Sequence, residues 1–412
     1  MSIHQDAKQI IDAALLAAQP DSAVQKALLE MKITEKGRLL VVSFGKAAWQ
    51  MAKAVSDALG DRISQGIVIT KYDHVMHELP RFMMWEAGHP IPDDNSFKAT
   101  AEAVQMVQGL KKEDTVLLLI SGGGSALFEQ PLIKPEELKD ITDQLLRVGA
   151  DITEINTLRK RLSAVKGGKF AQTCQPAQVV SIILSDIIGD PLDMIASGPA
   201  YPDSSTCEDA LRIINKYHLT LSSAAMDLMR QETPKDLPFV TSLVTGSVSK
   251  LCDAAAQQAK KLGYTPHILT ASLACEAKEA GRFLGAIAQY HQNSNHSLAF
   301  IAGGETVVRL TGKGKGGRNQ EIALSAAKEI RGLRDTLVFS LGSDGTDGPT
   351  DAAGGLADGQ TADALSALGY YIDEILQAND SYPALKSVDG LIMTGPTGTN
   401  VNDVSVLLIK RS

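Results

Sequence analysis

The chain has 412 residues, of which 44% are hydrophobic and 21% charged, and its formal net charge is −8. This composition is typical of a folded globular protein, and the acidic balance argues against nucleic acid as the main partner. Because the length exceeds one ordinary hydrophobic core, two domains are expected. No apolar run reaches the roughly 18 residues that a membrane-spanning helix needs, which argues against a membrane protein.

The N-terminal segment 1–24 mixes acidic with apolar residues and predicts an amphipathic helix rather than a signal peptide. The four cysteines, Cys174, Cys207, Cys252 and Cys275, show no C-x-x-C spacing. Scattered cysteines favour reduced thiols in a cytoplasmic protein over a zinc site or a disulfide framework. The oligomeric state is left open, with a homodimer as one option.

Short apolar runs alternate with helix-period segments along almost the whole chain. This alternation predicts an α/β fold built from βαβ units, with parallel sheets covered by helices on both faces. A polar segment with two prolines, 231–238, marks a boundary, so we expect domains at residues 1–235 and 236–412. Strands are expected at residues 39–43, 66–70, 115–120, 179–186, 239–246, 265–270, 297–304, 336–342 and 390–395.

Two glycine turns follow predicted strands in the first domain. In the turn SFGKA, Lys46 would lie at a helix N-terminus, where the helix dipole favours anions. This turn is not a Walker A loop, because Leu40 stands where that motif requires its first glycine. The second turn lets backbone N–H groups approach a phosphate closely, and a tight turn without a ligand is the alternative interpretation. It consists of Ser121, Gly122, Gly123, Gly124 and Ser125.

Further along the first domain lie a basic cluster and an acid at a strand end. The cluster predicts either a site for a small anion or a solvated helix face, and the two interpretations have equal support. Asp186 ends a very apolar strand, where it could serve acid–base chemistry, although an isolated aspartate there is more often a helix cap. The basic residues are Arg159, Lys160, Arg161, Lys166 and Lys169.

Residues 303–320, GGETVVRLTGKGKGGRNQ, form a loop rich in glycine and lysine that ends at Arg318. Such a loop suits a polyanion such as a nucleotide phosphate. It also matches G-x-G-x-x-G literally through Gly312, Gly314 and Gly317. A dinucleotide-binding fold needs an acid about 20 residues further on. Because Leu337 stands there, the motif disfavours a nicotinamide-dependent enzyme, which is kept as an alternative.

Three more features of the chain carry polar groups that suit a binding site. The segment 343–351 holds three aspartates, and we favour Mg²⁺ binding by Asp344 and Asp347 over Asx turns. The loop 394–400 carries hydroxyl and amide groups that suit phosphate or sugar. Among the dispersed histidines, His89 is the one that we single out.

Seven segments occur in an order that is specific as a set: SFGKAA, SGGGSAL, NTLRKRLSAVKGGK, ILSDIIGDPLDMIASGPAYPD, GGETVVRLTGKGKGGRNQE, GSDGTDGPTDAAGG and TGPTGTNVNDV. Together they resemble the glycerate 2-kinase family with a MOFRL-type C-terminal domain, some members of which are labelled hydroxypyruvate reductase. The resemblance implies two α/β domains, the N-terminal one Rossmann-like with a mainly parallel sheet, and an active site in the interdomain cleft. It also implies that ATP and Mg²⁺ are required and that D-glycerate is phosphorylated at its 2-hydroxyl.

The resemblance assigns transition-state charge stabilisation to Lys46 and Arg318, and Asp186 is our own choice of general base. The glycine turn 121–125, together with the basic helix, would hold the glycerate carboxylate or the nucleotide phosphates. An NAD(P)H-dependent hydroxypyruvate reductase and a non-catalytic metabolite sensor are the alternative functions. The remaining predicted binding residues are Arg159, Lys166, Gly303, Gly304, Glu305, Lys315 and Gly317, and the predicted metal ligands are Asp344 and Asp347.

Overall fold

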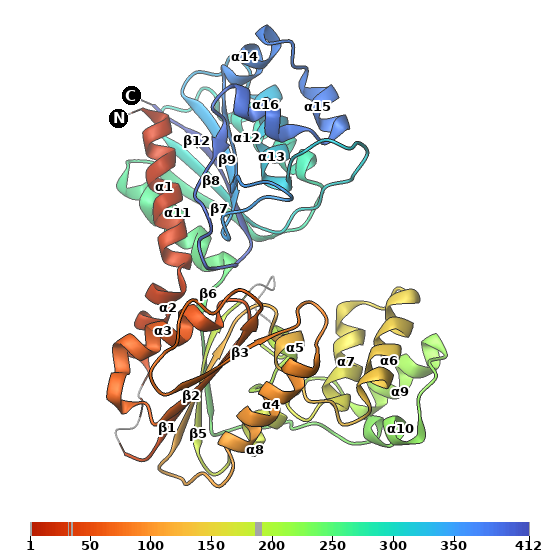
Figure 1. Cartoon of the computed structure of the whole chain (residues 1–412). Helices are drawn as coiled ribbons and strands as arrows, with labels where there is room; N and C mark the ends of the chain where they lie inside the picture. The colour runs from red at the N-terminus through yellow and green to blue at the C-terminus, as the bar shows by residue number, and fades with distance from the viewer. Residues whose placement is uncertain (1, 32, 34–35, 186–191, 412) are drawn as a thin grey trace. The chain divides into compact units, whose positions relative to one another are not determined.

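The structure is a computed structural model that describes residues 2–31, 33, 36–185 and 192–411 (Figure 1). The chain forms two compact units. The N-terminal unit is Ala23–Thr245, and the C-terminal unit combines Met1–Ser22 with Gly246–Ser412. These bounds differ from the expected division after residue 235. The N-terminal helix packs on the second sheet, and the strand that follows residue 239 completes the first sheet.

The N-terminal unit contains a six-stranded sheet in the order β3-β2-β1-β4-β5-β6. The pairs from β3 to β5 are parallel, which confirms the expected mainly parallel sheet. In β1, Val42 packs toward α4 and α8 whereas Val41 packs toward α2 and α3, so helices cover both faces. The strands are β1 (Leu39–Phe44), β2 (Gln65–Lys71), β3 (Phe82–Ala87), β4 (Thr115–Ile120), β5 (Gln178–Leu184) and β6 (Val240–Gly246).

A lobe of helices lies beside this sheet in Figure 1 and has its own apolar core. The core is formed by side chains such as Leu145, Leu158 and Ile214 from α6, α7 and α9. The helices of the N-terminal unit are α2 (Pro20–Glu30), α3 (Ala48–Leu59), η1 (Gly60–Arg62), α4 (Asp94–Met106), α5 (Gly124–Leu127), α6 (Pro135–Arg147), α7 (Ile152–Leu162), α8 (Lys169–Thr173), η2 (Ile195–Ser197), α9 (Cys207–Tyr217) and α10 (Ser223–Met229).

The C-terminal unit contains a second six-stranded sheet in the order β11-β10-β9-β12-β8-β7. In β12, Val406 packs with α1 and α11, whereas Leu407 packs with α12 and α13, so this sheet is also covered on both faces. Figure 1 shows α1 running beside α11. The strands are β7 (Thr265–Leu273), β8 (Leu298–Gly304), β9 (Thr336–Gly342), β10 (Gly354–Asp358), β11 (Leu391–Ile392) and β12 (Asp403–Ile409).

The second sheet is mixed, although the alternation of strands and helices predicted parallel sheets throughout. Only β7 and β8 pair in parallel among its described strands, and β12, β9, β10 and β11 pair antiparallel to their neighbours. The connection from β9 to β10 has no helix, and an antiparallel return needs none. The helices of this unit are α1 (Ile3–Ala18), α11 (Val248–Lys261), α12 (Ala277–His291), α13 (Arg318–Glu329), α14 (Thr361–Ala367), α15 (Ile372–Ala378) and α16 (Ser381–Ser387).

No helix in the described ranges is long and apolar enough to cross a membrane. Nine strands lie where the sequence predicted them, with ends that shift by a few residues. The strands β3, β10 and β12 were not predicted.

Candidate functional site

The order of strands in the N-terminal unit creates a topological switch point between β1 and β4. From β1 the sheet continues through β2 to β3 on one side, and from β4 through β5 to β6 on the other. Phe44 and Ile120 are register partners at the carboxyl ends of these two strands. In open α/β sheets, ligands bind beyond the strands at such a point. The two predicted glycine turns begin there, at Gly45 and Ser121.

Hydrogen bonds lock these two turns together. The backbone N–H of Lys46 donates to the carbonyl of Gly122 at 2.8 Å, and that of Ala47 donates to Ser121 Oγ at 3.1 Å. Gly45 has φ 118°, and a β-carbon there would lie 2.3 Å from Ser121 Oγ. Only glycine therefore fits at this position. The sequence predicted both turns, and the structure adds that they form one connected surface.

The glycine turn presents free backbone donors. Within the part of the chain that the structure describes, the N–H groups of Gly122, Gly123 and Gly124 donate no hydrogen bond. Gly122 and Gly124 are buried. Buried backbone N–H groups without a partner are rare in folded proteins, and adjacent ones form a concavity that binds anions. The turn therefore has the chemistry of an anion site.

Lys46 supplies a free positive charge beside these donors. Its side chain is half-buried, and no partner of its ammonium group lies in the described residues. A β-carbon at Gly123 would lie 3.2 Å from Lys46 Cγ and 2.9 Å from His89 Nε2. Two polar side chains from different strand ends thus meet over one glycine. That Lys46 binds an anion stays a prediction, which its position beside the glycine turn fits.

Ser125 lies at the other end of the turn and belongs to a chain of hydrogen bonds. Its Oγ is 3.0 Å from Ser197 Oγ, and Ser197 Oγ donates to Asn156 Oδ1 at 2.9 Å. Ser197 and Ala196 have φ values of 60° and 50°. Such left-handed backbone at a residue other than glycine costs energy and persists where the surroundings hold it. A side chain at Gly124 would collide with Ala196, with the two β-carbons 2.7 Å apart.

Arg159 and Lys166 hold the glycine turn in place through its last residue, Ser125. Both donate to the carbonyl of Ser125, at 3.0 and 2.8 Å respectively. Lys166 has no exposed surface, and its ammonium lies 3.3 Å from the buried carboxylate of Glu129. Burial lowers the pKa of Lys166 to about 8 against the raising effect of Glu129. The sequence predicted that Arg159 and Lys166 bind ligand, whereas the structure places Lys166 as an internal support of the turn.

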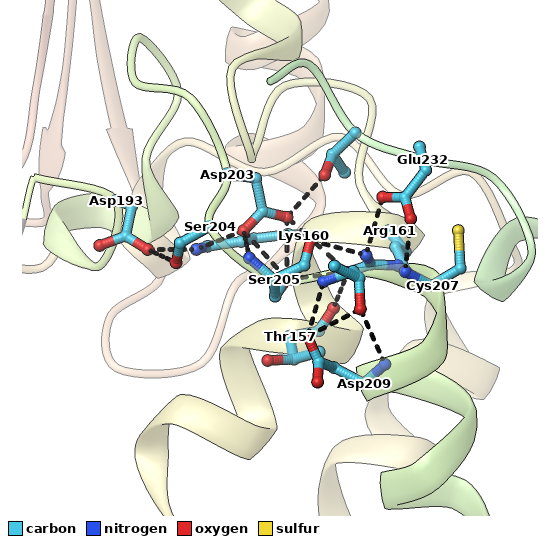
Figure 2. A network of polar contacts seen from close by, with 12 residues as sticks. Thr157, Lys160, Arg161, Asp193, Asp203, Ser204, Ser205, Cys207, Asp209 and Glu232 are labelled. Atoms are coloured by element: carbon cyan, nitrogen blue, oxygen red, sulfur yellow. Dashed lines mark hydrogen bonds and ion pairs between the residues drawn. The ribbon is translucent and has the colours of Figure 1, made fainter. Parts of the chain in front are cut away.

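The other basic residues of α7 form an internal network, drawn in Figure 2. The ammonium of Lys160 lies 3.0 Å from Asp203 and 3.3 Å from Asp193. Arg161 donates to Thr157 O at 2.9 Å and to Ser205 Oγ at 3.0 Å. Only 2% of the Lys160 side chain and 1% of the Arg161 side chain are exposed. These charges hold α7 against the segment that precedes α9, so they are neither an anion site nor a solvated face.

The C-terminal unit carries a second cluster, centred on Arg318 at the start of α13. The Nε of Arg318 donates to Asp403 Oδ2 at 2.5 Å, its NH2 to Asp403 Oδ1 at 3.0 Å and its NH1 to Glu305 at 3.0 Å. Asp403 begins β12 between its register partners Gly304 and Gly342, so strand pairing fixes its position. Burial raises the pKa of Asp403 to about 6, although Arg318 opposes the shift. At neutral pH both partners are charged.

The glycines that match G-x-G-x-x-G serve close packing. A β-carbon at Gly312 would lie 2.1 Å from the carbonyl oxygen of Ala378, and one at Gly317 would lie 2.2 Å from Asp347 Cγ. β8 ends at Gly304, so a long loop and not a tight turn precedes α13. The ammonium of Lys315, a predicted phosphate ligand, lies 4.3 Å from the ring centroid of Tyr382. The sequence therefore matches the dinucleotide motif by its letters, but the backbone does not form the strand–turn–helix that binds a dinucleotide.

Two other predicted glycines, at the end of β8, also meet backbone or core. Gly303 faces Cys252, whose sulfur would lie 2.5 Å from an added β-carbon. Gly304 would place a β-carbon 2.3 Å from the carbonyl oxygen of Leu273. Glu305 is exposed and serves as a partner of Arg318. These residues shape the surroundings of Arg318.

The two aspartates predicted to bind Mg²⁺ have other partners. The carboxylate of Asp347 is buried and accepts the backbone N–H groups of Asn319 at 3.1 Å and Gln320 at 2.9 Å, so it caps α13. Asp344 accepts the N–H and hydroxyl of Thr346 at 2.9 and 3.1 Å, as in an Asx turn. The described residues contain no group of three or more His, Cys, Asp or Glu side chains that could hold a metal. Asp186, our choice of base, lies outside the described residues.

Comparison with known proteins identifies the chain. The family model "Domain of unknown function (DUF4147)" matches residues 6–230, and the model "MOFRL family" matches residues 298–403. A D-glycerate 2-kinase of Thermotoga maritima is 49% identical over 414 aligned residues, which cover 99% of both chains. The chain belongs to the MOFRL-type glycerate 2-kinase family. This membership confirms the resemblance on which the sequence analysis relied.

Two further comparisons bear on structure and function. A crystal structure of a glycerate kinase from Thermotoga maritima matches with a TM-score of 0.94 and 48% identity, over 98% of this chain and 99% of the other. A putative hydroxypyruvate reductase of Agrobacterium vitis is 39% identical, over 99% of this chain and 95% of its own. Members of the family are therefore labelled either glycerate kinase or putative hydroxypyruvate reductase. The chemistry of the site is needed to choose between these two activities.

Sequence reasoning missed several residues of the two clusters. Asn156 and Ser197 lie inside two of the quoted segments but were given no role, and Glu129 lies just after the segment SGGGSAL without being singled out. Asp403 follows the polar loop 394–400 and was not singled out, although it opens the apolar run of β12. That apolar run is the signal that would have marked Asp403 as a strand-end carboxylate.

Proposed function

We propose that this protein is a glycerate 2-kinase that transfers the γ-phosphoryl group of ATP to the 2-hydroxyl of D-glycerate. One observation carries the proposal: a free lysine, Lys46, lies beside the unpaired N–H groups of Gly122, Gly123 and Gly124 at the switch point of a parallel sheet. The 49% identity to a D-glycerate 2-kinase along the whole chain supports the same substrate.

Phosphoryl transfer demands positioning and positive charge more than covalent chemistry from the protein. The N–H groups of the turn 121–125 would hold anionic oxygens of the transferred group or of the glycerate carboxylate. The Lys46 ammonium would neutralise charge that develops in the transition state. Preorganised donors of this kind are worth most in a site with little water. The interlocked turns supply that preorganisation, because Lys46 and Gly122 share a hydrogen bond of 2.8 Å.

Arg318 is the second cation that we assign to the reaction. Its guanidinium group has five N–H donors, and the three hydrogen bonds to Asp403 and Glu305 leave two of them free. About a third of the side chain, 33%, is exposed. We propose that Asp403 and Glu305 orient Arg318 while its remaining donors contact phosphate oxygens.

Mg²⁺ enters this proposal as part of the substrate. Mg²⁺ usually reaches kinase sites through nucleotide phosphates, with one or two carboxylates and waters completing its shell. Asp347 does not fit as a ligand, because both of its oxygens accept backbone N–H groups. Asp344 has one carboxylate oxygen without a hydrogen bond in the described residues and can serve as a single ligand. Magnesium-bound ATP is therefore the nucleotide substrate that we propose.

The proposed reaction has a direct test that also covers the reductase label. Purified protein is incubated with D-glycerate, ATP and Mg²⁺ while ADP is followed, and in parallel with hydroxypyruvate while NADH or NADPH is followed. Glycerate-dependent ADP formation, with a product that phosphorus NMR identifies as 2-phosphoglycerate, supports the kinase. Oxidation of the nicotinamide without ADP formation supports the reductase, and activity in neither assay would favour a sensor.

Location and assembly complete the proposal. All four cysteines, each in the described part of the chain, are free thiols, which fits a reducing compartment, and we propose the cytoplasm. The homodimer remains a hypothesis that sedimentation of the purified chain tests.

A further inference from the structure

His89 contacts the glycine turn at Gly123, and the proposed function does not use it. It follows β3, whose last residue, Ala87, pairs in parallel with Lys71 at the end of β2. The carboxyl ends of β1, β2, β3 and β4 therefore lie at the same edge of the sheet. From that edge the His89 ring reaches the glycine turn, where its Nε2 would lie 2.9 Å from a β-carbon at Gly123.

The His89 ring has no competing partner. Its side chain is half-buried, and neither ring nitrogen forms a hydrogen bond within the part of the chain that the structure describes. By contrast, Nδ1 of His74, which lies 15 residues earlier in the chain, is 3.1 Å from the carbonyl oxygen of Tyr72. The His89 ring therefore contacts the glycine turn and keeps both nitrogens free. A ligand bound at this turn would lie within reach of the ring.

The charges around His89 keep its ring neutral. Burial lowers the pKa of His89 below its ordinary value of 6.5, and the ammonium groups of Lys46 and Lys71 lower it further. The nearby carboxylates are engaged elsewhere. Glu86 accepts the N–H groups of His74 and Val75.

The other neighbouring carboxylate, Asp93, also has its own partners. It accepts the Tyr72 hydroxyl at 2.6 Å and caps α4 through the N–H of Ser96 at 3.0 Å. A histidine that faces two lysines, without an ion-paired acid, is a free base at neutral pH.

We propose that His89 is the general base that accepts the proton of the reacting glycerate hydroxyl, an inference that rests on the proposed kinase function. As the hydroxyl oxygen forms its bond to the γ-phosphorus of ATP, its proton moves to His89 Nε2. The bond between the γ-phosphorus and the bridging oxygen breaks, and its electron pair leaves on ADP. The protonated ring then returns its proton to solvent, so no further reactant is needed.

The proposed base, His89, and the cation Lys46 lie at the same point of the glycine turn. Both Lys46 and His89 lie over Gly123, so an acceptor hydroxyl directed at the transferring group would also face the ring. Lys46 lowers the pKa of His89, and it would also hold the phosphoryl oxygens near the attacking oxygen. The sequence-based choice of Asp186 as base falls outside the described residues, and His89 replaces it in our proposal.

The test replaces His89 by Ala and by Gln and measures glycerate phosphorylation. General bases contribute at least about 10²-fold to turnover, so we expect a loss of that size in both variants. Added imidazole should restore part of the turnover of His89→Ala, an effect that a merely structural role of the ring does not produce. His296→Gln, an exposed histidine in the C-terminal unit, is the control and should keep wild-type turnover.

The pH profile gives a second readout. In the wild type, kcat/KM for glycerate should fall as the pH drops through the pKa of His89, and His89→Gln should lose this part of the profile. Wild-type turnover and an unchanged profile in His89→Gln would overturn the role of His89 while leaving the kinase intact. A wild-type protein that forms no ADP with glycerate would overturn both proposals, so the two failures are distinguishable.

Discussion

Glu129 and Lys166 form an ion pair in which neither side chain has any exposed surface, with 3.3 Å between the ammonium and the carboxylate. Lys166 also donates to the carbonyls of Ser125 and Phe128, at 2.8 and 2.9 Å. Glu129 has no hydrogen bond to either carboxylate oxygen in the described residues, so it depends on its cationic neighbours. The pair thus ties the glycine turn to the interior of the N-terminal unit.

Lys166→Met should therefore destabilise the protein strongly. Among the described residues, the buried carboxylate of Glu129 then keeps only the ion pair with Arg159, at 3.6 Å, and breaking a buried pair costs about 3–5 kcal/mol of unfolding free energy. Urea unfolding at neutral pH measures the change. The control is Lys53→Met, which breaks an exposed pair with Asp57 four residues away and should cost about 0.5 kcal/mol or less. Equal costs in the two variants would contradict the structural role of Lys166.

Gly123→Ala should abolish most of the activity while the protein stays folded. The residue has φ 83°, and its β-carbon would crowd His89 and Lys46 and enter the space of the bound anion. Gly109→Ala is matched to it, because Gly109 has φ 66° and open space around the β-carbon position. Both substitutions carry a similar backbone strain of about 1–2 kcal/mol. Comparable kcat/KM values in the two variants would argue against a ligand at the glycine turn.

Asp347→Ala should weaken α13 without changing the requirement for Mg²⁺. Loss of a carboxylate that caps a helix costs about 1–2 kcal/mol, whereas loss of the half-exposed Asp344 should cost about 0.5 kcal/mol or less. Thermal or urea unfolding compares the two variants. Turnover as a function of Mg²⁺ concentration is the second readout. A large rise in the Mg²⁺ needed by Asp347→Ala would restore the metal role that the sequence predicted.

Asp403 should make stability depend on pH in an unusual direction. Its pKa is about 6 in the folded protein, against an ordinary 3.8, so between these values the native state binds more protons than the unfolded state. The free energy of unfolding contributed by this group therefore falls as the pH rises from about 4 to 6. The difference in unfolding free energy between wild type and Asp403→Asn, measured as a function of pH, gives the contribution of Asp403. Asparagine at this position has no proton to lose or gain in that pH range. A difference that stays constant, or that grows with pH, would contradict the buried position of Asp403.

Much of the fold followed from local pattern. Apolar runs such as 115–120 marked the strands, and the glycine turns marked their carboxyl ends. The strand 82–87, FMMWEA, was missed because its residues are only partly buried and show no alternation. β12 lies between β8 and β9 although residues 343–402 separate it from β9 in sequence. No local pattern reports such a pairing, because it depends on how the whole sheet assembles.

The site shows the same division between local and long-range information. The strand-end positions of Lys46 and the turn 121–125 could be predicted, because each is a short motif that follows an apolar strand. The internal roles of Lys160, Arg161 and Lys166 could not be predicted, because their partners come from other elements. A count of charges along α7 cannot tell an exposed cation from one whose carboxylate partner, such as Asp203, arrives from a later segment.

We propose that Lys46 acts at a phosphoryl-transfer site, and steady-state kinetics of Lys46→Ala measure that role. We expect glycerate-dependent ADP formation to fall about 10²-fold or more, as for a lost transition-state donor, and Arg318→Ala to behave similarly. Circular dichroism should show that both variants stay folded, and Lys53→Met should keep wild-type turnover. Near-normal turnover in Lys46→Ala and Arg318→Ala would contradict a role of these two cations in phosphoryl transfer.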